Sequence, residues 1–75
     1  MERIFKVLKL ESGERVEGVE LGFADHPGHD PIAPAQPASF VRYVGADGRV
    51  VRMEKHADEA AAVRWVDELE RRVGR

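Results

Sequence analysis

Two runs rich in β-prone apolar residues flank a short polar turn in the second half of the chain. The runs cover residues 39–44 and 49–56, and Asp47 and Gly48 lie between them. A tight turn needs a residue that tolerates positive φ, which glycine does without a Cβ clash. The pattern therefore predicts a β-hairpin.

The run that follows, residues 58–73, has the spacing of an amphipathic helix. Its apolar positions are separated by four, three and four residues, with two flanking positions: Ala62, Val66, Leu69 and Val73, flanked by Val63 and Trp65. Asp58 can accept hydrogen bonds from the free amides of the first turn, and Arg71 and Arg72 lie near the negative end of the helix dipole. We expect the apolar stripe to pack on the sheet.

The first half of the chain predicts two more strands, residues 3–10 and 14–23, joined by a turn at Ser12 and Gly13. Strict alternation would place Ile4 on the face opposite Phe5 and Val7, so both faces of the first strand carry apolar side chains. Gly18 lies inside the second strand, and an interior glycine often marks a bulge. We expect a bulge at Gly18.

Together these elements predict an α+β fold in a single domain of residues 1–75. The fold is a four-stranded antiparallel β-meander, with one C-terminal helix packed on it. Residues 24–38 connect the second and third strands and contain four prolines, which exclude both a helix and a central strand. A loop of this length in so small a domain is typical of binding segments, although a plain connector fits the pattern too.

The size of the chain limits its core. With 75 residues, folding buries only about 60% of the surface that the unfolded chain exposes. The chain has no cysteine, so it has neither a disulfide nor a thiolate metal site to stabilise it. One helix covers one face of a sheet, so we expect the other face to be covered by a second copy, by a partner or by the 24–38 loop. We favour a homodimer or higher homo-oligomer.

Charge is unevenly distributed along the sequence. The formal net charge is −2, which provides no global attraction for nucleic acid or for an acidic membrane. Acidic residues dominate between Glu11 and Asp30, whereas basic residues dominate between Arg42 and Lys55. The candidate partner-binding residues are the acids of the second strand and the charged residues of the loop: Glu14, Glu17, Glu20, Asp25, His26, His29 and Asp30.

Within the loop, two histidines three residues apart are flanked by carboxylates, at Asp25, His26, His29 and Asp30. Imidazole nitrogen and carboxylate oxygen are ordinary ligands of zinc or nickel. No cysteine and no Glu-x-x-His motif accompanies this segment, and such residues commonly face solvent in turns. The third histidine, His56, could approach the loop, but at the end of a strand its default role is structural or solvent-exposed. We therefore predict no metal site and no cofactor.

The sequence offers little for catalysis. Ser12 and Ser39 are the only serines, there is no threonine or cysteine, and no glycine-rich phosphate loop occurs. Carboxylates such as Glu54, near His56, are ordinarily solvated on strand surfaces. We expect a protein that is not an enzyme.

A four-strand meander followed by one helix is similar in outline to the single-strand-binding transcriptional coactivators. Their dimers use curved sheets that carry basic and aromatic side chains. The resemblance implies a nucleic-acid-binding hairpin here, formed by Arg42, Tyr43, Arg49, Arg52 and Lys55. It is a resemblance of topology only, and the net charge and the few aromatic residues favour a different role.

The favoured interpretation is a small protein-interaction module that self-associates and acts as a regulatory, inhibitory or accessory partner of another protein. Single-stranded nucleic-acid binding is the alternative. No segment is long and apolar enough for a signal peptide or a membrane span, so we expect a cytoplasmic protein.

Overall fold

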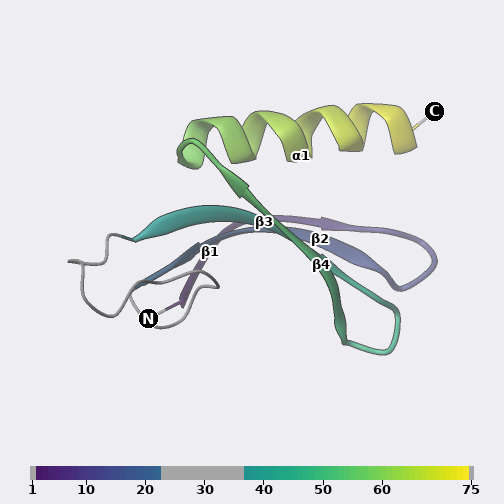
Figure 1. Cartoon of the computed structure of the whole chain (residues 1–75). Helices are drawn as coiled ribbons and strands as arrows, with labels where there is room; N and C mark the ends of the chain where they lie inside the picture. The colour runs from purple at the N-terminus through teal and green to yellow at the C-terminus, as the bar shows by residue number, and fades with distance from the viewer. Residues whose placement is uncertain (1, 23–36, 75) are drawn as a thin grey trace.

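The computed structural model describes residues 2–22 and 37–74. The elements are β1 (Glu2–Lys9), β2 (Arg15–Leu21), β3 (Ala38–Val44), β4 (Val50–His56) and α1 (Glu59–Val73). The strands form one antiparallel sheet in the order β1-β2-β3-β4, and α1 lies along one face of it (Figure 1). The predicted α+β fold is confirmed.

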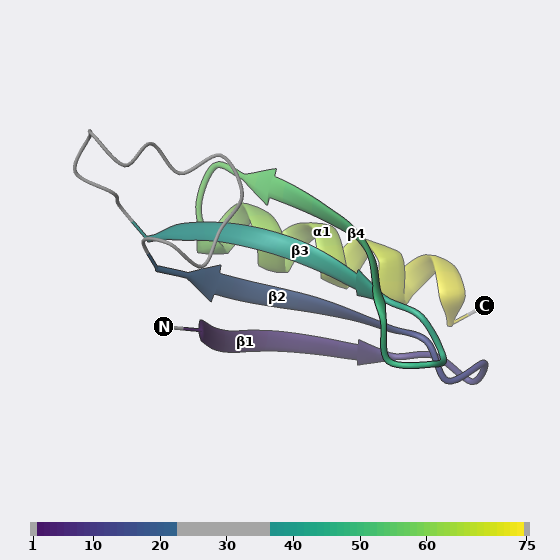
Figure 2. The same cartoon turned by 60° about the horizontal axis from the view of Figure 1, so that its bottom comes forward.

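The two hairpin turns form where the sequence places them. Gly13 and Gly48 have φ values of 94° and 85°, a region that side chains with a Cβ rarely adopt. In the second turn the Asp47 carboxylate accepts a hydrogen bond from the backbone N–H of Arg49 at 3.0 Å. Both turns keep consecutive strands adjacent, which produces the meander seen in Figure 2.

The bulge that we expected at Gly18 lies on the opposite strand. The register of β1 with β2 shifts between Ile4 and Lys6, across from Gly18, whereas β2 pairs with β3 without a shift. Phe5 packs where a Cβ on Gly18 would be, with its Cε1 atom only 2.6 Å from that position. The extra residue in β1 therefore accommodates the Phe5 ring over a glycine that offers it space.

The bulge also changes which β1 residues share a face. Because one residue is inserted, Ile4 and Val7 pair with Val19 and Glu17 on the sheet face opposite α1. Phe5 instead packs with Leu8 in the cluster beneath the helix. The strict alternation predicted for this strand, with Ile4 opposite Val7, is wrong for that reason.

The main core lies between α1 and the sheet. Its buried members come from β1, β2, β3 and the helix: Leu8, Val16, Val41, Ala62 and Val66. Trp65 and Leu69 pack against this cluster as the helical spacing predicts. Val73, the last position of the predicted stripe, is 57% exposed because the stripe extends to the end of the helix, beyond the buried cluster.

A second buried cluster lies on the opposite face of the sheet, which we call the open face. It contains Val19, Leu21 and Phe40, with Ala38 and Met53 packed against it. We also considered that the 24–38 loop covers this face. Most of that loop lies outside the described residues, so this stays a prediction.

Helix α1 begins as its capping sequence predicts. The Asp58 side chain accepts a hydrogen bond from the backbone N–H of Ala61 at 2.8 Å. Gly74 ends the helix by donating its N–H to the Glu70 carbonyl at 2.9 Å. Among the residues described, the structure has no helix that is both long and apolar enough to cross a membrane.

Candidate interaction surfaces

Four of the candidate partner-binding residues, Asp25, His26, His29 and Asp30, lie outside the described residues. Their predicted role stays a prediction. Within residues 2–22 and 37–74, no group of three or more histidine, aspartate or glutamate side chains is placed to hold a metal ion.

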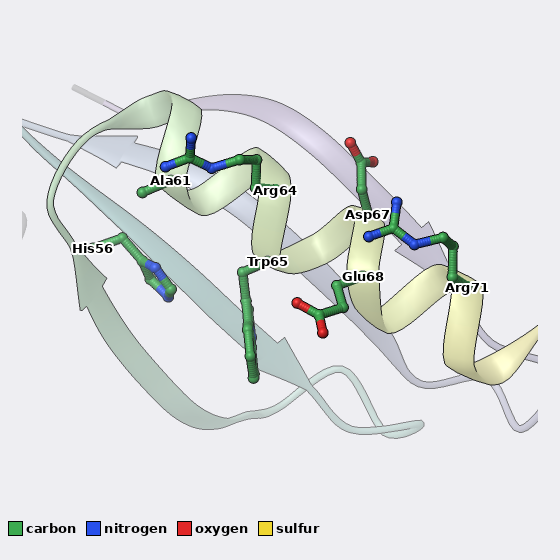
Figure 3. A pocket seen from close by; sticks show the side chains of 7 residues that line it. All are labelled: His56, Ala61, Arg64, Trp65, Asp67, Glu68 and Arg71. Carbon is green, nitrogen blue, oxygen red and sulfur yellow. The ribbon is translucent and has the colours of Figure 1, made fainter.

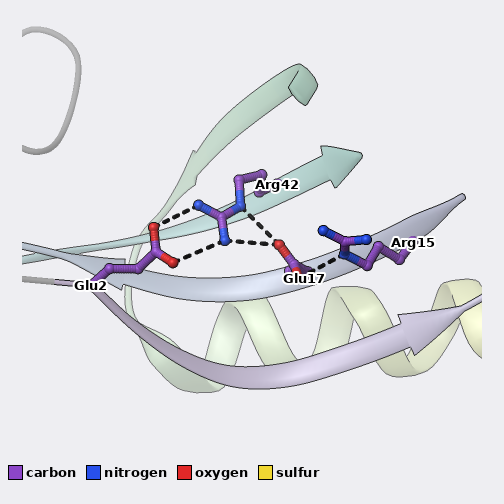
Figure 4. Close-up of polar contacts among 4 residues, drawn as sticks. All are labelled: Glu2, Arg15, Glu17 and Arg42. Carbon is purple, nitrogen blue, oxygen red and sulfur yellow. Dashed lines mark hydrogen bonds and ion pairs between the residues drawn. The ribbon is translucent and has the colours of Figure 1, made fainter. Parts of the chain in front are cut away.

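Glu17 lies in an ion-pair network on the open face rather than on a solvated surface. Its carboxylate accepts hydrogen bonds from Arg42 at 2.9 Å and from Arg15 at 3.0 Å (Figure 4). Arg42 also donates to both carboxylate oxygens of Glu2, at 2.8 and 3.2 Å. Only 7% of the Glu17 side chain and 13% of the Arg42 side chain are exposed, so Glu17, a candidate partner-binding residue, is buried in this network rather than solvated.

The network is electrostatically neutral because its two carboxylates balance its two guanidinium groups. The hydrogen bond to Glu2 raises the pKa of Arg42, burial opposes this, and Glu17 raises the pKa further. The bidentate contact with Glu2 fixes the planar guanidinium between two strands that are not neighbours. The network thus ties β1 to β3 across β2.

The other two acids of the predicted acidic surface lie elsewhere. Glu20 is on the α1 side of the sheet, where it pairs with Arg3 at 3.1 Å, and Arg3 also pairs with Glu59 of the helix. Glu14 precedes β2 and accepts a hydrogen bond from the Ser12 hydroxyl at 2.9 Å. The three glutamates therefore do not form one continuous acidic strip, because a strand directs alternate side chains to opposite faces.

The five residues of the basic hairpin are also divided between surfaces. Strand pairing places Arg42 and Lys55 on the open face, and Tyr43 and Arg52 on the α1 side. Arg49 lies in the turn, 3.6 Å from Asp47. Arg42 and Arg52 are both paired with carboxylates, so the described residues form no continuous basic groove.

A chain of hydrogen bonds crosses from α1 to β4, and sequence reasoning did not identify it. The Trp65 indole N–H donates to the Tyr43 hydroxyl at 2.6 Å, and that hydroxyl donates to Glu54 at 2.8 Å. Arg52 donates to the second oxygen of Glu54 at 2.7 Å, and its guanidinium lies 5.9 Å from the centre of the Tyr43 ring. Alternation along β3 and β4 places these side chains on one face, but the contact with Trp65 depends on how the helix packs.

Burial raises the pKa of the Tyr43 phenol. The hydrogen bond from Trp65 lowers this pKa, and the hydrogen bond to Glu54 raises it further. A raised folded-state pKa contributes stability that is complete below the unfolded pKa, about 10, and is lost as pH rises through the folded pKa. We expect phenolate absorbance, which reports Tyr43 alone because it is the only tyrosine, to rise at higher pH in the folded protein than in urea. Equal midpoints in the two states would contradict the assigned contacts.

A shallow groove runs along the outer side of α1 near the end of β4. Figure 3 shows His56 at the end of β4 and Trp65 projecting from α1, with ring centroids 6.4 Å apart. Two acids and two arginines of the helix line the rest: Asp67, Glu68, Arg64 and Arg71. Because charges of both signs line it, the groove does not indicate one class of small ligand.

Strand β4 is the least covered strand of the sheet. None of its seven residues is buried, although β2 and β3 each bury several. Val50 and Val51 are 51% and 69% exposed at its start. An exposed edge strand with unpaired backbone groups is a template for pairing with another chain.

Comparison of the chain with protein-family models, with curated proteins and with solved structures found no match. Functional inference therefore depends on the surfaces described above.

Proposed function

We propose that this protein is a small, non-enzymatic interaction module that self-associates and acts as a regulatory, inhibitory or accessory partner of another protein. The observation that carries the proposal is the exposure of β4, an edge strand with two exposed valines and no buried residue. Apolar side chains on an unpaired edge are favourable to bury in an interface.

The open face supports the other part of the proposal, that the protein binds another protein as a regulatory, inhibitory or accessory partner. Ile4 and Val7 are 45% and 44% exposed there, next to the ordered Arg42 network. An arginine held in place beside aliphatic side chains resembles the centre of many protein interfaces, because little side-chain entropy is lost on binding. The neutral network favours a partner with matched polar groups over a simply basic one.

Light scattering after size exclusion, over a range of protein concentrations, tests the self-association. We expect the mass to rise from that of one chain, 8.4 kDa, to that of two as concentration increases. A mass that stays at one chain throughout the range would refute self-association.

The alternative, nucleic-acid binding, is separated from the proposal by titrating the same sample against a fluorescent single-stranded oligonucleotide at low and moderate salt. We expect no saturable binding, because the cations of the hairpin are divided between two faces and two of its arginines are paired with carboxylates. Salt-sensitive affinity in the micromolar range or tighter would overturn the proposal and favour Arg49, Arg52 and Lys55 as the contacts.

A further inference from the structure

We propose that self-association occurs edge to edge at β4, with two copies pairing antiparallel about a two-fold axis at Met53. This inference depends on the proposed function, since it names the surface through which the chain meets its second copy. The result is one continuous eight-stranded sheet with both helices on the same side.

The sequence of β4 is self-complementary in this register. Antiparallel pairing about Met53 places Arg52 opposite Glu54 of the second copy, and Glu54 opposite its Arg52. Both side chains lie on the α1 side of the sheet, because they pair with Tyr43 and Val41. Opposite charges directly across a strand pair are stabilising, and here the two-fold axis produces two such pairs.

The remaining positions of β4 fit the same register. Met53 lies opposite its own copy on the open face, which gives the seam an apolar centre. Val51 lies opposite Lys55, whose aliphatic stem can cover the valine while its ammonium stays in water. The 69% exposed Val51 thus gains a neighbour that the single chain does not supply.

The carboxylate of Glu54 is held in place by its own chain before two copies meet. The Tyr43 hydroxyl holds one oxygen and Arg52 of the same chain holds the other, at 2.8 and 2.7 Å. Trp65 in turn holds Tyr43. A group fixed before binding loses less conformational entropy on association than a free one, so this hydrogen-bond chain pre-organises the β4 edge.

The opposite edge of the sheet is less suited to pairing. The register shift between Ile4 and Lys6 interrupts β1 near its middle, and a bulge disrupts the regular spacing of outward backbone groups. In β4 the extra residue is Val51, so the bulge affects only the outer Val51 and Lys55 pairs, and the centre of the seam from Arg52 to Glu54 is regular. The geometry therefore favours β4 over β1 as the pairing edge.

Charge reversal at the seam gives the first test. Arg52→Glu or Glu54→Arg alone places like charges across the two-fold axis, and we expect each to weaken dimerisation at least tenfold in sedimentation equilibrium. The double variant Arg52→Glu/Glu54→Arg restores both pairs, and an equimolar mixture of the two single variants forms the mixed dimer. Arg72→Glu, which reverses a charge on the exposed side of α1, is the matched control and leaves the mass unchanged.

Mild oxidation of single-cysteine variants tests the register, since the natural chain has no cysteine. Met53→Cys brings two sulfurs together across the axis and cross-links into a covalent dimer. Val51→Cys and Lys55→Cys are each about four strand positions from their own copies, beyond the reach of a disulfide. We expect only the Met53→Cys variant to cross-link rapidly, and circular dichroism checks that each variant folds.

The outcomes separate this inference from the function on which it depends. The proposed pairing of two β4 strands, the β4 seam, is supported if the single reversals disrupt the dimer, the double variant restores it and position 53 cross-links. A dimer that is unaffected by the reversals and does not cross-link at position 53 overturns the seam but leaves self-association standing. A natural chain that remains monomeric at every concentration overturns both.

Discussion

Replacing Gly18 with valine should destabilise the fold by about 3 kcal/mol, because overpacking a filled site forces side chains and backbone to move. A Cβ at this position would meet the Phe5 ring at 2.6 and 3.1 Å and the Lys6 Cβ at 3.2 Å. Real Cβ contacts are not as short as 2.6 Å, so the ring has to leave its place beneath Arg3. In a domain of this size the loss is a large part of the total stability. Urea denaturation followed by circular dichroism measures it.

A smaller substitution, Gly18→Ala, also brings a Cβ against the Phe5 ring, so a double-mutant cycle of Gly18→Ala with Phe5→Ala isolates that contact. In a Phe5→Ala background the ring is absent, and Gly18→Ala should become neutral or stabilising by about 0.5–1 kcal/mol, since glycine in a strand is entropically unfavourable. Gly48→Ala is not a suitable control because Gly48 has positive φ. If Gly18→Ala cost the same with and without Phe5, the close approach of ring and backbone would not be the reason for a glycine here.

The regular parts of the fold were predictable from local sequence signals. The turn glycines, the Asp58 cap and the spacing of Ala62 and Val66 each act within a few residues, so the sequence carries them directly. The sequence did not predict which strand contains the bulge. Its position depends on the fit of Phe5 over Gly18, two residues that are distant in the sequence and meet only after β1 and β2 have paired.

The candidate surfaces were harder to predict for the same reason. Glu17 and Glu20 look alike in the sequence, but the first faces Arg42 and the second faces Arg3 on the other side of the sheet. To distinguish them, one must know how three strands pair. To predict the contact of Trp65 with Tyr43, one must know how the helix is rotated over the sheet. Alternation predicts that residues share a face, whereas only packing decides which of them touch.

Reversing the charge at Glu17 should destabilise the protein by about 3–5 kcal/mol, the usual cost of breaking a buried ion pair. Glu17→Lys would place a third positive charge between Arg15 and Arg42 with only Glu2 to compensate, in a site where the native carboxylate is 7% exposed. Glu17→Gln keeps the size of the side chain and one acceptor, so it should cost less, about 1–3 kcal/mol. Urea denaturation of the three proteins at low salt gives the ranking.

Glu20→Lys is the matched control, because it makes the same substitution on the same strand at an exposed pair. Glu20 and Arg3 are 38% and 53% exposed, and surface pairs of this kind contribute little to stability. The two reversals change the net charge equally, so any difference in stability reports the local environment rather than the overall field. Equal and small effects would mean that the Arg42 network is solvated and that the open face has no ordered polar centre. A large effect at Glu17 alone would establish that network as part of the folded core, and binding studies of the open face would then need substitutions at Ile4 or Val7 instead.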